Sequence, residues 1–145
     1  RFDPASYARF LLDDVVTVGP SNEPVGRRAL LQMGVGDPQV PNVGTELHAR
    51  MLGVPVVTGS AKAPIFGLHG VDAPHRGSGL FAYGFGIDTS FYETATPAAD
   101  GNAVHEAVRR SPEALEQLDR FFHDGVIVNP CGARCDVEVP DGTPQ

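Results

Sequence analysis

The sequence of 145 residues predicts an α/β fold with a parallel sheet flanked by helices and an insertion of irregular or β structure. The first observation is the apolar run Ala29–Met33, which follows Arg27 and Arg28 and precedes a Gly-Val-Gly stretch, as is typical of a buried parallel strand. The second is a helical pattern over 43–52 with a second apolar run at 54–57. Strand, helix and strand in this order form a βαβ unit, which favours a parallel sheet with a right-handed crossover.

A helix is expected near the N-terminus, from Asp3 to Val16. Asp3-Pro4 resembles an N-cap followed by proline in the first turn. The apolar residues that follow recur at helical spacing: Tyr7, Phe10, Leu11 and Val15. Residues 19–26 are rich in glycine and proline and are expected to form a loop.

The helix over 43–52 has recognisable ends. Asn42 is a good N-cap and Gly53 a good stop, while Glu46 and Arg50 are spaced to form an ion pair. One stripe, expected to be buried, carries Val43, Leu47 and Met51.

Residues 58–99 break the alternation of strands and helices. They are rich in glycine and aromatic residues without helical spacing, and about forty residues exceed an ordinary loop. We interpret them as an insertion that acts as a lid, a pocket wall or an oligomer contact, or whose aromatic residues form a satellite core. Within it, Leu80–Ile87 alternates loosely and favours a strand or hairpin arm.

A second clear helix begins near the C-terminal end of the chain. Ser111 is its expected N-cap, Pro112 lies in its first turn, and Gly125 ends it. Residues 126–128 are expected to add a short edge strand. The face expected to be buried carries Leu115, Leu118, Phe121 and Phe122.

Composition excludes several classes of function. The net charge is −7 and no basic run occurs, so nucleic acid is not an expected partner. No apolar run approaches the roughly 20 residues of a membrane-spanning helix. Cys131 and Cys135 lie in a proline-rich tail, residues 126–145, for which a local disulfide and an oxidising compartment are favoured over two free thiols. A zinc site would need two more ligands nearby.

The segment MGVGDPQVPN, residues 33–42, places one carboxylate, Asp37, directly after the first strand. Its Gly-Val-Gly is similar to half of a dinucleotide-binding fingerprint, but Gln39 stands at the third glycine position and no acid ends the second strand. An acid held after a strand can instead orient a histidine by accepting the Nδ1 proton. The glycines and Pro38 around Asp37 suit such a rigid position.

The order strand, Gly-x-Gly-Asp-x-x-Val-Pro, helix, strand and then a histidine before the last helix resembles the C-terminal part of the α/β-hydrolase family, which includes esterases and lipases. The resemblance implies that Asp37 is the acid and His105 the base of a Ser-His-Asp triad. It also implies that residues 1–125 are the C-terminal portion of a hydrolase domain that cleaves a small-molecule or lipid ester and needs no metal or organic cofactor.

This sequence departs from the family pattern in two ways. The separation between Asp37 and His105 is unusually long, so His69 remains a second candidate for the base. No G-x-S-x-G nucleophile elbow is present. We therefore expect the nucleophile outside this chain, no activity from the chain alone, and a partner: the missing N-terminal portion, as a second chain if the protein is cleaved. The expected location is secreted or in the cell envelope.

Two other readings stay open. A non-catalytic binding module would hold Asp37 and His105 far apart and expose Leu80–Ile87 as an apolar patch. A hydrolase-like scaffold could also have lost its nucleophile and its activity.

Overall fold

A four-stranded sheet forms the centre of the fold in the computed structural model, which describes residues 7–13, 16–18, 23–87 and 102–144. The strand order is β3-β7-β4-β5, and each neighbouring pair is parallel. The strands are β3 (Leu30–Gly34), β7 (Gly79–Tyr83), β4 (Val56–Val57) and β5 (Gly70–Val71). The prediction of an α/β fold with a parallel sheet is thus confirmed.

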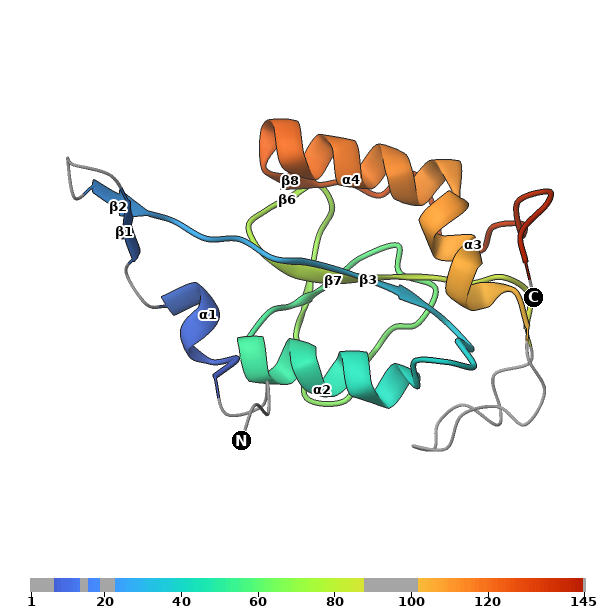
Figure 1. Ribbon diagram of the computed structural model, residues 1–145, viewed down its shortest axis with the longest axis horizontal. Coiled ribbons are helices and arrows are strands. Elements are labelled where there is room, and N and C mark those ends of the chain that lie inside the picture. The colour runs from blue at the N-terminus through green and yellow to red at the C-terminus, as the bar shows by residue number, and fades with distance from the viewer. Residues whose placement is uncertain (1–6, 14–15, 19–22, 88–101, 145) are drawn as a thin grey trace.

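Helices cover both faces of the sheet (Figure 1). Helix α2 (Asn42–Leu52) packs on one face, and α3 (Val104–Arg110) and α4 (Pro112–Asp124) pack on the other. Helices α2 and α4 end at Gly53 and Gly125, both with left-handed backbone conformation, as the sequence predicts. One buried core cluster lies on each side of the sheet.

The N-terminal segment differs from the expected long helix. Helix α1 spans only Phe10–Asp13, and β1 (Val16–Val18) pairs antiparallel with β2 (Glu23–Val25). The helix expected from Asp3 to Val16 is therefore wrong at Val16, and the loop expected over 19–26 is wrong at β2; residues 3–6, 14–15 and 19–22 lie outside the described residues. Strand β1 consists of β-branched residues, which favour a paired strand over a helix. The helical spacing of the four apolar residues before it therefore does not extend the helix to Val16.

Helix α2 turns a different face to the sheet from the one expected. Its buried residues are Asn42, Glu46 and Ala49, whereas Leu47 is 50% exposed. The prediction of a buried stripe through Leu47 is wrong. The expected pair of Glu46 with Arg50 is also wrong, because Glu46 pairs with Lys62 at 2.7 Å.

The segment expected to be an insertion contains the central strand β7. This strand lies between β3 and β4, and its Leu80, Phe81, Ala82 and Tyr83 are fully buried. Residues 58–87 are therefore part of the sheet and its connections, which corrects the expectation for this part of 58–99; residues 88–99 lie outside the described residues. Leu80–Ile87 does contain a strand, as predicted.

Helix α4 begins as expected but buries another face. The Ser111 hydroxyl accepts a hydrogen bond from the Ala114 N–H at 3.4 Å, and Ala114 and Gln117 face the core. Leu115 is 49% exposed and Phe122 75% exposed, so the predicted buried face is wrong at these two residues. Leu115 and Phe122 therefore lie beyond the area that the described part of the chain covers, whereas Leu118 and Phe121 are half-buried.

A buried polar network joins α4 to the sheet. The Tyr83 hydroxyl donates to Gln117 Oε1 at 2.9 Å, and Gln117 Nε2 donates to the Val128 carbonyl at 2.6 Å. Gln32 Nε2 donates to the Ala114 carbonyl at 2.8 Å. Burial raises the pKa of Tyr83 above its ordinary value, so its hydroxyl stays a donor.

The C-terminal tail adds a small second sheet and a cysteine pair. The expected strand at 126–128 is β8 (Val126–Ile127), which pairs antiparallel with β6 (His75–Arg76) apart from the main sheet. Cys131 and Cys135 lie at disulfide distance, with their Cα atoms 5.2 Å apart. The local pairing favoured from the sequence is present.

Candidate functional site

Asp37 lies in the turn that follows β3, and its two carboxylate oxygens have different partners. Oδ1 accepts hydrogen bonds from the main-chain N–H groups of Gln39 at 2.8 Å and Val40 at 2.9 Å. Oδ2 lies 2.9 Å from His105 Nδ1. The turn therefore fixes one oxygen of Asp37 and directs the other toward the histidine.

Two glycines make this geometry possible. Gly36 has a φ of 90°, which favours glycine. At Gly34 a Cβ atom would lie 2.5 Å from Val104 Cγ1 and 2.8 Å from Val108 Cγ2. The glycine therefore lets α3, which carries His105, pack closely on the end of β3.

Replacing Gly34 with alanine is expected to destabilise the fold by about 1–3 kcal/mol, because α3 must move away from β3. Urea unfolding measures this change. Gly44→Ala is the matched control: a Cβ there meets no atom within 4 Å, and alanine in a helix is expected to stabilise by about 0.5–1 kcal/mol. Equal unfolding midpoints for both variants would contradict the close packing of α3.

His105 lies in the first turn of α3, not in a connector before the terminal helix as the sequence suggested. Asn102 fixes the start of this helix, because its Oδ1 accepts from the Val104 N–H at 2.9 Å. Its Nδ2 donates to the Gly36 carbonyl at 3.1 Å. One side chain therefore ties the helix of His105 to the turn of Asp37.

The predicted contact between Asp37 and His105 is present. The side chain of Asp37 is 12% exposed and that of His105 is 17% exposed. Along the chain, Asp37 comes after strand β3 and His105 comes after strand β7, and these two strands are neighbours in the sheet. In open α/β sheets ligands bind at the carboxyl ends of the strands. In a nucleophilic triad the acid contacts the histidine through Nδ1, which is the arrangement of this pair.

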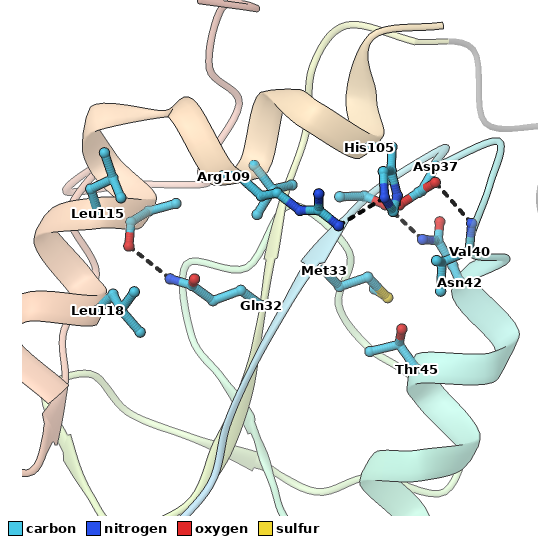
Figure 2. A pocket seen from close by; sticks show the side chains of 13 residues that line it. Gln32, Met33, Asp37, Val40, Asn42, Thr45, His105, Arg109, Leu115 and Leu118 are labelled. Atoms are coloured by element: carbon cyan, nitrogen blue, oxygen red, sulfur yellow. Dashed lines mark hydrogen bonds and ion pairs between the residues drawn. The ribbon is translucent and has the colours of Figure 1, made fainter. Parts of the chain in front are cut away.

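The other ring nitrogen of His105 also has a partner. Nη2 of Arg109 lies 2.9 Å from His105 Nε2, and Nη1 of Arg109 donates to Glu106 Oε1 at 3.0 Å. Figure 2 shows the chain of contacts from Arg109 through His105 to Asp37.

A pocket of about 370 Å³ opens beside these side chains (Figure 2). Gln32 and Met33, whose side chains point to opposite faces of the sheet, both line it, so the pocket wraps around the outer edge of β3. Helix α2 forms one wall and helices α3 and α4 form the other. The apolar lining consists of Met33, Val40, Val108, Ala114, Leu115 and Leu118.

The outer edge of β3 carries no strand in the described part of the chain. Ala29 O and Val35 N bond to β7, so the main-chain groups of the even-numbered residues of β3 point to the outer edge. There Asn42, only 2% exposed, donates to the Gly34 carbonyl at 2.6 Å and accepts from the Gly36 N–H at 2.9 Å. The prediction that Asn42 is the N-cap of α2 is therefore wrong, because Pro41 is the N-cap. The side-chain amide of Asn42 instead forms hydrogen bonds to the edge of β3, as a peptide group of a neighbouring strand would.

The remaining histidines lie elsewhere. His48 is in α2, His69 is exposed before β5, His75 is in β6, and His123 pairs with Asp119 at 3.4 Å on the exposed surface of α4. None of them lines the pocket beside Asp37. Among the residues that the structure describes, no group of three or more His, Cys, Asp or Glu side chains could hold a metal ion. Within the same ranges, no helix has the length and apolar character needed to cross a bilayer.

No protein-family model, curated protein or solved structure matches this chain.

Sequence reasoning missed Asn42, Asn102 and Arg109 as members of this site. Asn102 stands two residues before Val104, whose N–H it binds, and Arg109 stands one helical turn after His105. These signals become readable only once His105 is known to lie inside a helix.

Proposed function

We propose that this chain is the C-terminal portion of a serine hydrolase of the α/β-hydrolase type that cleaves an ester or similar acyl bond. The single observation that carries the proposal is the contact of Asp37 Oδ2 with His105 Nδ1 at the carboxyl ends of adjacent parallel strands. The chain contributes the acid and the base, and the nucleophile lies outside it.

In the proposed reaction, a serine hydroxyl outside this chain attacks the acyl carbon, and its proton passes to His105 Nε2. Asp37 accepts the Nδ1 hydrogen bond and stabilises the imidazolium that forms. His105 then returns the proton to the leaving alcohol, and water releases the acyl group by the same route. The donors that stabilise the tetrahedral oxyanion also lie outside this chain.

The proposed partner is the N-terminal portion of the same hydrolase, in the same chain or as a second chain. Two features support this partner: the outer edge of β3, and the exposed apolar side chains of Leu47, Leu115 and Phe122. A neighbouring strand with its own helices would cover both the edge and these side chains. A strand placed there brings its carboxyl end next to His105. That is where the nucleophile is needed.

The pocket supports a small-molecule or lipid ester as the substrate, since apolar side chains line it beside polar ones that include Asp37, His105 and Arg109. The mechanism requires no metal or organic cofactor. The cysteine pair is compatible with a secreted or envelope location.

The two marks of a binding module are not met. Asp37 and His105 are in contact, and within Leu80–Ile87 the residues from Leu80 to Phe85 are buried, Ile87 is half-buried and Gly86 is exposed. An inactive hydrolase-like scaffold differs from the proposal in lacking a nucleophile, which the following experiment detects.

The test is to label the full-length protein, including the segment N-terminal to this chain, with a fluorophosphonate probe. We expect labelling of the full-length protein, none of His105→Ala, and unchanged labelling of His69→Ala, which is the matched histidine control. Labelling lost only in His69→Ala would move the base to that residue. No labelling of the wild-type protein would favour the inactive scaffold.

A further inference from the structure

Asp37 and Arg109 together determine which nitrogen of His105 carries the proton. A guanidinium group only donates hydrogen bonds, so at 2.9 Å the Nε2 atom of His105 must accept. The proton of the neutral imidazole therefore lies on Nδ1 and is donated to Asp37. This is the tautomer that a general base needs, because Nε2 keeps its lone pair.

The position of Arg109 follows from the helix. Residues four apart lie on the same side of a helix, so Arg109 lies one turn after His105 on α3. Glu106, on the same helix, accepts from the other terminal nitrogen of the guanidinium at 3.0 Å. The guanidinium thus spans two acceptors, one of which holds it beside the imidazole.

The contact also occupies the position that the proposed nucleophile requires. A serine hydroxyl that donates its proton to Nε2 must lie where Arg109 Nη2 now lies, because the pocket opens on that side of His105 (Figure 2). The two groups compete for one lone pair. When a hydroxyl replaces Arg109 at Nε2, or Arg109 returns, no proton leaves the guanidinium, which keeps all its N–H groups.

We propose that Arg109 is a positioning residue: together with Asp37 it orients the His105 ring with the proton on Nδ1, and it covers Nε2 until a hydroxyl takes its place. This inference rests on the proposed function for the identity of that hydroxyl. The groups that face His105 are Asp37 from the turn after β3 and Arg109 from α3, and Glu106 acts through Arg109.

The test uses the chain itself and needs no nucleophile. Diethyl pyrocarbonate acylates an imidazole nitrogen that has an accessible lone pair, and peptide mass spectrometry gives the rate at each histidine. The rate at His105 is divided by that at exposed His69 in the same molecule. In Arg109→Met the ratio is expected to rise roughly three- to tenfold, the range expected from losing one partly exposed charged hydrogen bond.

Three further variants separate positioning from a general effect on the fold. Arg109→Lys restores a cationic donor and is expected to return the ratio toward that of the wild type. Glu106→Gln removes the charge that holds the guanidinium and is expected to raise the ratio less than Arg109→Met does. Arg110→Met, at the next exposed position, is the matched control and should leave the ratio unchanged.

The ¹⁵N chemical shifts of the His105 ring provide a second readout. A role of Arg109 in the stability of the fold alone would not change these shifts. The wild-type chain is expected to show a protonated Nδ1 and an unprotonated Nε2. A protonated Nε2 in the neutral wild-type ring, or an unchanged labelling ratio in Arg109→Met, would overturn the proposal. Because neither measurement uses the fluorophosphonate probe, failure here is distinguishable from failure of the proposed hydrolase activity.

Discussion

Asp37→Asn in the full-length protein is expected to lower kcat for hydrolysis of a chromogenic ester by roughly 10⁴-fold. The asparagine oxygen can still accept from the Gln39 and Val40 N–H groups, so the turn should keep its shape. Its amide then points an N–H toward His105 Nδ1, which favours the tautomer with the proton on Nε2. That tautomer cannot take the proton of a nucleophile.

Two measurements control this result. Asp72→Asn changes an exposed carboxylate far along the chain from the site and should leave kcat unchanged. Thermal melting of Asp37→Asn should show a cooperative transition, so that the loss of rate is not a loss of fold. Retention of wild-type kcat by Asp37→Asn would show that Asp37 does not orient the base.

Phe81→Ala is expected to have the largest effect on stability, about 3–5 kcal/mol. Phe81 is fully buried in the central strand β7, and its ring centroid lies 5.1 Å from that of Tyr83. Alanine leaves a cavity between the sheet and α4 and removes the aromatic pair. Because the total stability of a domain is of order 5–15 kcal/mol, this change is expected to remove a large fraction of it.

Phe66→Ala is the matched control for that experiment. Phe66 lies in the connection between β4 and β5 and is 92% exposed, so its replacement is expected to change stability by no more than about 0.5 kcal/mol. Chemical denaturation of both variants measures the difference. Similar losses at the two positions would contradict the placement of β7 at the centre of the sheet.

The positions of β3, α2 and α4 were predictable because each has local signals at its ends. A glycine pair follows β3, and Gly53 and Gly125 end the two helices with left-handed backbone conformation. The contact of Asp37 with His105 was expected from the resemblance to the α/β-hydrolase family. The turn after the strand indicated only that a carboxylate is held rigidly there.

Strand β7 could not be placed from the sequence, because pairing partners far apart along the chain leave no local signal. Gly79–Tyr83 is buried on both faces and so lacks a strict alternation, and its place between β3 and β4 depends on long-range register. The buried faces of α2 and α4 were wrong for a related reason. The periodicity of Leu47 or Leu115 identifies an apolar stripe, but not whether this chain or another covers it.

The amide of Asn42 sets how far any strand added beside β3 can extend. It already satisfies the Gly34 carbonyl and the Gly36 N–H, so main-chain pairing remains open at Leu30, at Gln32 and at the Gly34 N–H. An added strand must therefore leave the ladder at Gly34, before it reaches Asp37. On the proposed function, the missing part of the hydrolase would approach His105 from this point, so a single asparagine would set how far the two parts of the sheet can pair.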